Sequence, residues 1–275
     1  KRKPEHAHLS TDLIAEMNGY ERTESHGSTP KYYIKADTAR TFSDNHQELE
    51  NAYVKVYAAD GQAFDEIRSN KAIYVPEAAK NFTAYLAGAV NINTRDGLKI
   101  ETDGVTYTRS NETAETDDKI AFDRDNIRGT SLGATVKMGE KKLELRHDVE
   151  IETFETAEKK AVNVKYAKLN AANAMYDQAA NSIELTGGFK ARIESSGRNS
   201  DLSADRAIAW LSGNETSPES RDLTKLELFT GVHIVSSDGK TTTLDTEHAV
   251  YDKLLDRFAL NDSARIVKVQ DSRTT

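Results

Sequence analysis

The sequence predicts an all-β protein: an elongated antiparallel sheet, creased along its length. Two apolar patterns that return along the chain predict strands, and helix signals are few, with residues 11–18 (TDLIAEMN) the only helix candidate. The chain has 275 residues, of which 37% are hydrophobic and 30% charged. This low apolar fraction fits a body with much surface per residue better than two compact enzyme domains.

The first repeated pattern is a leucine, any three residues, an apolar residue, any one residue, and a second apolar residue. Its apolar positions share parity, so on a strand they point to one face while polar residues occupy the other. The position two after the leucine, Gly88 in the first copy, lies on the same predicted face and is rarely large. A ligand or a bend would each explain that small side chain. The copies are Leu86-Val90-Ile92, Leu145-Val149-Ile151, Leu185-Phe189-Ala191, Leu228-Val232-Ile234 and the weaker Leu260-Ala264-Ile266.

The second pattern begins with Ile or Leu, has a small residue two positions on, Ala or Val three positions after that, and often Tyr two positions further. Two copies end in another residue, Thr41 and Ala209. Because the middle spacing is three rather than two, a strand keeps one side buried only if it bulges or bends there. Short polar side chains suit such bends, and they also suggest a cation ladder, although calcium-binding repeats need tighter, glycine-rich spacing. The step is occupied by Asp37, Asn70, Asp103, Asp205 and Glu247, with Ala172 as the exception. The repeat therefore predicts a sheet in which every strand folds over at the same level.

Several function classes are disfavoured by composition and by motif content. The net charge of −8 disfavours a nucleic-acid partner, and the absence of cysteine removes disulfides, thiolate catalysis and cysteine-based zinc sites. No P-loop, nucleophile elbow, Ser/His/Asp set or distinct pair of carboxylates is recognisable. The sequence therefore predicts a protein that is not an enzyme and that uses no cofactor or metal.

A creased sheet without helices must hide its apolar face by folding over on itself, as a half-pipe or roll, although a closed β-helix or a sandwich would serve too. A trough lined by Val, Ile, Leu and Ala suits a long apolar ligand such as an acyl chain. The same residues would form the core of any β fold, so each has a purely structural interpretation as well. The candidate lipid-binding residues are Leu86, Gly88, Val90, Ile92, Leu145, Val149, Ile151, Leu185, Phe189, Leu228, Val232 and Ile234.

The alternative function is that of a repeat-built β-helical protein that binds polysaccharide or acts on it as an enzyme. An exposed stripe of aromatic residues with paired carboxylates would favour this alternative. The sequence shows neither feature.

Four stretches resemble the OstA-like family of lipopolysaccharide transport proteins. Residues 32–57 (YYIKADTARTFSDNHQELENAYVKVY) and 86–107 (LAGAVNINTRDGLKIETDGVTY) are similar to its LptC type. Residues 169–191 (LNAANAMYDQAANSIELTGGFKA) and 244–262 (LDTEHAVYDKLLDRFALND) are similar to its LptA type. The resemblance extends from about residue 30 to 270, and its motifs are degenerate.

The resemblance implies a β-jellyroll or β-taco fold, located in the periplasm, whose interior holds the acyl chains of lipid A. It implies three partners: lipopolysaccharide, other Lpt β-rolls joined by edge-strand addition at both ends, and an inner-membrane ABC transporter. It further implies an N-terminal helix, absent from this chain, that anchors the protein to the inner membrane.

The same resemblance predicts the organisation of the chain. Residues 1–29 are expected to be a segment that follows a removed anchor or signal, 30–158 an LptC-like roll, and 159–275 an LptA-like roll that is either separate or continuous with the first. The chain is then an LptC with an extended roll or an LptC–LptA fusion. The acidic segment 153–161 (TFETAEKKA) is the expected junction.

Overall fold

The computed structural model describes residues 9–78, 81–95, 97–124, 126–154, 164–195, 197–212, 223–238, 240–252 and 257–269. Its 18 strands belong to one sheet, and the strand pairs described below are antiparallel. The prediction of an all-β antiparallel fold is confirmed. Within the described ranges, no helix is long and apolar enough to cross a membrane.

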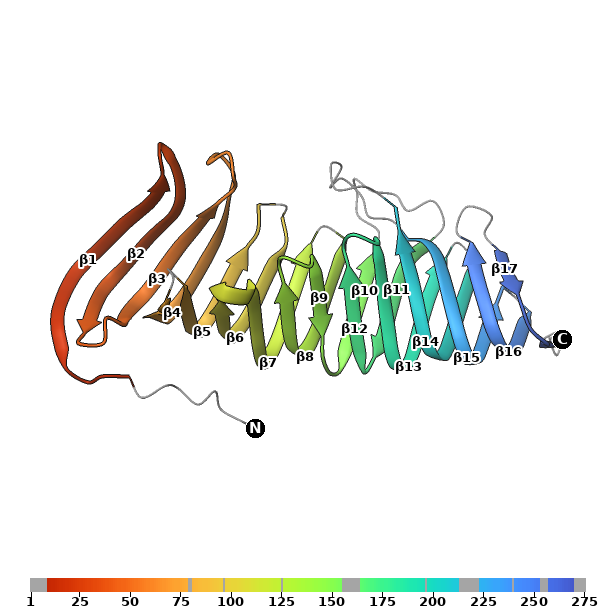
Figure 1. The fold of residues 1–275 in the computed structure, drawn as a ribbon. Helices are drawn as coiled ribbons and strands as arrows, with labels where there is room; N and C mark the ends of the chain where they lie inside the picture. The colour runs from red at the N-terminus through yellow and green to blue at the C-terminus, as the bar shows by residue number, and fades with distance from the viewer. Residues whose placement is uncertain are drawn as a thin grey trace. The chain divides into compact units, whose positions relative to one another are not determined.

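The chain divides into two compact units, which are described separately, and unit 1 comprises Lys1–Phe122 and Lys137–Gly139. From β1 to β6, each strand pairs with the next one along the chain (Figure 1). A 3-10 turn, η2 (Arg109–Asn111), follows β6. The strands are β1 (Leu13–His26), β2 (Thr29–Phe42), β3 (Gln47–Tyr57), β4 (Phe64–Pro76), β5 (Phe82–Asn93), β6 (Lys99–Thr108) and most of β7 (Thr113–Arg124).

The helix candidate at residues 11–18 does not form a helix. Most of this segment belongs to β1, which pairs with β2 from Leu13 opposite Phe42 to His26 opposite Thr29. Helix propensity is a weak preference, and a long ladder of backbone hydrogen bonds to a neighbouring strand overrides it. β1 is exposed along almost its whole length.

Unit 2 comprises Asp123–Val136 and Glu140–Thr275. Three pairs of short strands, β9 with β10, β11 with β12 and β17 with β18, are each two halves of one strand that is interrupted in the middle. Consequently β13 pairs with both β11 and β12, and β16 pairs with both β17 and β18. The strands are β8 (Ile127–Lys137), β9 (Lys142–Leu145), β10 (Val149–Phe154), β11 (Val164–Ala171), β12 (Asn173–Asp177), β13 (Ser182–Ser195), β14 (Arg198–Leu211), β15 (Leu223–Ser237), β16 (Thr241–Asp252), β17 (Arg257–Leu260) and β18 (Arg265–Val269).

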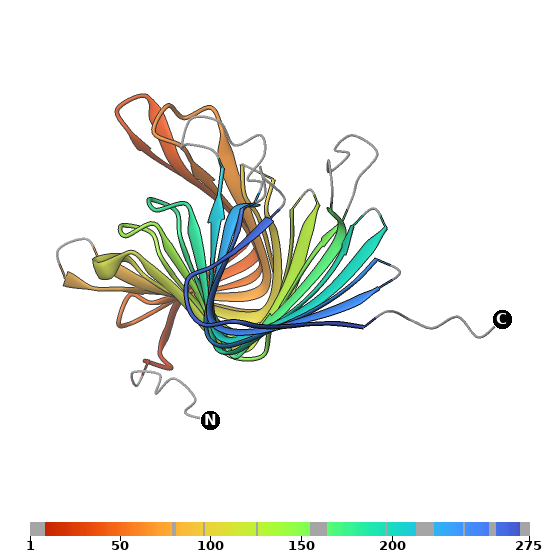
Figure 2. The same ribbon diagram turned by 90° about the vertical axis from the view of Figure 1, so that its right-hand side faces the viewer.

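Within each unit the strands bend partway along their length (Figure 2). The bend coincides with a shift of register, for example between Ala87 and Val90 where β5 pairs with β6, and between Phe229 and Val232 where β15 pairs with β16. Extra residues in one strand of a pair bend that strand and increase its twist. We call the line of these bends across neighbouring strands the crease. The crease divides the sheet into two halves, which we call arm A and arm B. Arm A contains Ile34 in unit 1 and β10, β11 and β18 in unit 2. Arm B is the other half.

At the crease, one polar residue faces two residues of the neighbouring strand. Asp103 lies opposite Gly88-Ala89, Asp205 opposite Gly187-Gly188, and Glu247 opposite Thr230-Gly231. The three acidic side chains are exposed, and Glu247 accepts the backbone N–H of Gly231 at 3.4 Å. The predicted crease is confirmed: the three-residue step of the second pattern lies opposite a bulge of the neighbouring strand, and its polar side chain is turned to solvent.

Gly88 shows why a small residue is needed at this point. Its φ is +75°, and the next residue, Ala89, also has a positive φ of 50°. A Cβ on Gly88 would lie 3.1 Å from the side chain of Asn70 on the neighbouring strand. A residue with a side chain is strained at positive φ. The bend therefore accounts for the glycine in backbone terms.

Candidate functional site

The residues that point between the two arms form rows across neighbouring strands, because antiparallel pairing sets opposite side chains side by side. In unit 1 the arm A row consists of large aliphatic residues, and all of them are half-buried. Each pairs directly with the next, which makes the row continuous over five strands. The arm A row is Ile34, Val54, Ile67, Ile92 and Ile100.

The side chains of the arm B row of unit 1 are more buried than those of the arm A row. It runs through Ala39, Leu49, Ala72, Leu86 and Val105. The first three are buried and form one hydrophobic cluster with two alanines at the crease, against which Leu86 and Ile34 pack. The inner face of unit 1 is therefore apolar. Small buried residues fill it near the crease, and large half-buried residues line it further out.

In unit 2 the corresponding rows are mostly buried. On arm A, Ala191, Leu202 and Ile234 are buried, whereas Leu244 is half-buried. On arm B, Leu185 and Leu228 are 0% exposed. The arm A row is Ile151, Leu169, Ala191, Leu202, Ile234, Leu244 and Ile266, and the arm B row is Leu145, Ala174, Leu185, Ala207, Leu228, Ala249 and Leu260.

The first sequence pattern now has a structural meaning: its leucine lies on arm B, its middle apolar residue at the crease, and its last apolar residue on arm A. Leu86, Val90 and Ile92 occupy these three places. Of the twelve candidate lipid-binding residues, Leu86, Gly88 and Ile92 are half-buried. The other nine are buried: Val90, Leu145, Val149, Ile151, Leu185, Phe189, Leu228, Val232 and Ile234.

Buried members of this set hold the arms together. Phe189, at the crease of unit 2, is 0% exposed and pairs with Ala204. Removing a buried phenylalanine side chain costs about 3–5 kcal/mol. A ligand on the inner face would instead touch the half-buried residues.

The sequence interpretation missed most of the accessible row. Ile34, Ile67 and Ile100 begin copies of the second pattern but are not among the candidate residues, and neither is Val54. Their signal was the large aliphatic residue that opens each copy. What the sequence could not provide is the strand register that aligns them with Ile92.

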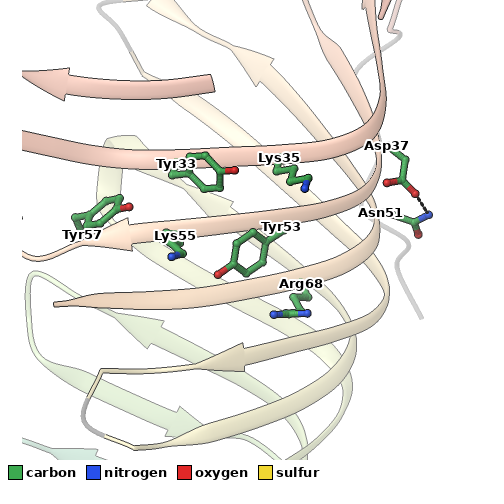
Figure 3. A pocket seen from close by; sticks show the side chains of 8 residues that line it. All are labelled: Tyr33, Lys35, Asp37, Asn51, Tyr53, Lys55, Tyr57 and Arg68. Carbon is green, nitrogen blue, oxygen red and sulfur yellow. Dashed lines mark hydrogen bonds between the residues drawn. The ribbon is translucent and has the colours of Figure 1, made fainter. Parts of the chain in front are cut away.

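The outer face of unit 1 carries a shallow depression of about 480 Å³, shown in Figure 3. Two of its cations lie over aromatic rings: the Arg68 guanidinium is 4.8 Å from the ring centroid of Tyr53, and Lys55 Nζ is 4.0 Å from that of Phe64, which is outside the lining. No aromatic stripe was recognised in the sequence, and this cluster, which combines a ring of β2 with two rings of β3, was missed. Its lining residues are Tyr33, Lys35, Asp37, Asn51, Tyr53, Lys55, Tyr57 and Arg68.

Two carboxylates beside the depression are engaged by phenol groups. The Tyr33 hydroxyl donates to Glu21 at 2.6 Å, and this hydrogen bond raises the pKa of Tyr33. Burial, together with a hydrogen bond to Glu66, raises the pKa of Tyr53 to about 12. Asp37, the one carboxylate among the lining residues, accepts the Asn51 amide at 2.8 Å. The depression therefore lacks the facing pair of carboxylates that acid–base cleavage of a glycosidic bond uses.

Metal binding also lacks a geometric basis in the part of the chain that the structure describes. No three His, Asp or Glu side chains come together there as a candidate metal site. The exposed acidic residues at the crease lie on separate strands and face the backbone bulges of their neighbours. Their arrangement supports the interpretation that they stabilise bends.

A protein-family model matches the N-terminal part of the chain. The family model described as "Lipopolysaccharide-assembly, LptC-related" matches residues 2–154, which is more than half of the chain. No curated protein matches the chain. The match includes all strands of unit 1, whose inner face carries the half-buried arm A row. The chain belongs to the LptC-related family of lipopolysaccharide-assembly proteins.

Proposed function

We propose that the chain is a periplasmic lipopolysaccharide-binding protein that holds the acyl chains of lipid A against its inner face. Its family takes part in lipopolysaccharide transport, with lipopolysaccharide and other Lpt components as partners. The observation that carries the finer proposal is the arm A row of unit 1. It offers a continuous line of large aliphatic side chains that remain half-buried.

The energetics of such binding favour the acyl chains over the sugars. Each buried methylene contributes about 0.8 kcal/mol, whereas an unpaired polar group costs free energy when it leaves water. Acyl chains therefore gain by lying along the row, and the sugars remain in solvent. Because this binding is non-directional and spread over many weak contacts, an acyl chain can slide along the row from one pair of residues to the next.

We propose further that the chain is one segment of a bridge from the inner-membrane ABC transporter to the outer membrane. The transporter supplies the energy, and an N-terminal helix anchors the protein to the inner membrane. Terminal strands with free backbone groups accept a strand from another chain. β1, with Leu13, Ile14 and Met17 exposed, and β18, with Ile266 and Val269 exposed, are the strands suited to this pairing.

The LptA-like character of the C-terminal part also stays a proposal, as does the division into rolls of 30–158 and 159–275. It rests on the repeated rows of unit 2, which reproduce the arrangement of unit 1 on both arms. Most of the expected junction, residues 155–161, lies outside the described residues.

A photo-crosslinking amino acid tests acyl-chain binding. Val90 and Phe189 are fully buried, so a bulky probe there would disturb the core; Ile67 is half-buried and better suited. Its neighbour Arg68 is exposed on the outer face and is the matched control. The proposal predicts labelling by lipopolysaccharide at position 67 and little at 68.

The reverse pattern would contradict acyl-chain binding. Lipopolysaccharide or polysaccharide labelled at position 68 and not at 67 would instead favour the polysaccharide-binding alternative, with the depression of Figure 3 as its site.

A further inference from the structure

One arginine spans the two arms of unit 1 at their ends furthest from the crease. Arg109 follows arm B of β6, and its Nη1 donates to the hydroxyl of Tyr32 on arm A of β2 at 3.2 Å. The two residues are 77 positions apart in the chain. Tyr32 is two residues beyond Ile34, the first member of the arm A row. The Arg109–Tyr32 hydrogen bond therefore crosses the open side of the apolar inner face.

Aromatic rings surround this contact on arm B. The Arg109 guanidinium lies 5.6 Å from the ring centroid of Phe82, which is 5.1 Å from that of Tyr74 and 5.7 Å from that of Tyr107. Burial raises the pKa of Tyr107, and both Tyr32 and Arg109 act on it electrostatically. All five side chains are half-buried. Arg109 thus places a cation at the open edge of the apolar inner face, between the ends of the two arms.

The partner of Arg109 is a weak one for a guanidinium. Arginine has five N–H donors and pairs best with a carboxylate or phosphate, which accepts two parallel hydrogen bonds. Within the described residues, Arg109 makes no ion pair, and its hydrogen bond goes to a neutral phenol. Charge-assisted hydrogen bonds are roughly twice as strong as neutral ones, so an anionic group that arrived here would displace Tyr32.

We propose that Arg109 binds a phosphate of the lipid head group and that its hydrogen bond to Tyr32 closes the inner face of unit 1 when no lipid is bound. This inference rests on the proposed function. Two residues of a strand span about 6.6 Å, so a head group at Arg109 leaves the acyl chains to begin at Ile34. A few well-placed polar groups beside an apolar surface fix the orientation of a ligand in this way.

The test compares two ligands, lipid A with its phosphates and the same lipid after enzymatic dephosphorylation, by equilibrium binding to the full chain. Arg109→Gln is expected to weaken binding of the phosphorylated lipid about tenfold or more, the loss of a charged hydrogen bond, and to leave the dephosphorylated lipid unaffected. Tyr32→Phe removes the contact across the arms and keeps the cation. It is expected to bind the phosphorylated lipid at least as tightly as the unmodified protein.

Arg68→Gln is the matched control, because Arg68 also stacks on an aromatic ring but lies on the outer face. Equal effects of Arg109→Gln and Arg68→Gln would overturn the inference, and so would an equal loss for both lipids. Ile67→Ser separates the two proposals. If it weakens both lipids while Arg109→Gln weakens neither, acyl-chain binding stands and the role of Arg109 falls. If the unmodified protein binds neither lipid, both proposals fall.

Discussion

Ala172 and Gly187 face each other at the crease of unit 2 so closely that a Cβ on Gly187 would lie 2.5 Å from the Cβ of Ala172. Gly187 has a φ of +78°, so both its backbone and its surroundings require glycine. Ala172 is the exception in the series of polar residues at the crease. Its small side chain, placed between β11 and β12, lets the neighbouring strand pass at this distance.

Gly187→Ala should therefore destabilise the protein more than Gly188→Ala. Gly188 also has a positive φ, +92°, but nothing lies within 4 Å of a Cβ built on it. A left-handed conformation alone costs about 1–2 kcal/mol for a residue with a side chain, and Gly187→Ala adds the clash. Urea unfolding of the two variants measures the difference, and equal losses would contradict the close approach.

Substitution of Phe189 tests whether the crease is a packed core. Phe189→Ala is expected to lower the free energy of unfolding by about 3–5 kcal/mol. Phe229, which is half-buried and stacks on His248 at 4.9 Å on the outer face, provides a control of the same residue type. Phe229→Ala should cost about 1 kcal/mol. A Phe189→Ala loss no greater than that of the control would argue against a packed crease.

A pH-dependent contribution is expected from the chain segment before β1. The Asp44 carboxylate accepts the backbone N–H of Ser10 at 2.9 Å and contacts His46 Nδ1 at 2.5 Å. The Ser10 hydrogen bond is the main cause that lowers the pKa of Asp44 from 3.8 to about 2. Because the folded pKa is the lower one, this stabilisation is complete above pH 4 and is lost as the pH falls through about 2.

Asp44→Asn should accordingly be less stable than the unmodified protein at pH 6, and the difference should shrink between pH 4 and pH 2. Urea midpoints at several pH values measure it. Asp12→Asn is the control, since the Asp12 side chain accepts no hydrogen bond within the described residues. A difference that stays constant across this range would show that Asp44 acts without its charge.

The crease could be predicted from the sequence because its cause is local. A step of three residues recurs in every copy, with a short polar side chain or a glycine beside it in most, and each of these features reports on the backbone at one point. The arm A row was visible only in part, since Ile92 joined the candidate set while its partners Ile67 and Ile100 did not. Their alignment depends on register, which is set by pairing between strands.

The contact between Arg109 and Tyr32 could not be predicted from the sequence, for a different reason. It joins β2 to the turn that follows β6, two parts of the chain that do not pair with each other, and it depends on how closely the ends of the arms approach. No periodicity encodes that distance. The helix candidate at residues 11–18 failed similarly, because the partner strand that overrode its propensity lies outside the segment.

Methyl NMR of the isoleucine-labelled protein tests acyl-chain binding most directly, with a lipid A whose acyl chain carries a nitroxide. The methyl signals of Ile34, Ile67, Ile92 and Ile100 should broaden, because these residues line arm A of unit 1. The half-buried Ile73 and Ile208, which pair with Glu48 and Glu184 on the outer face, serve as internal controls. Broadening of the row with the controls unaffected is the predicted result. Broadening of the controls without the row would contradict acyl-chain binding on the inner face.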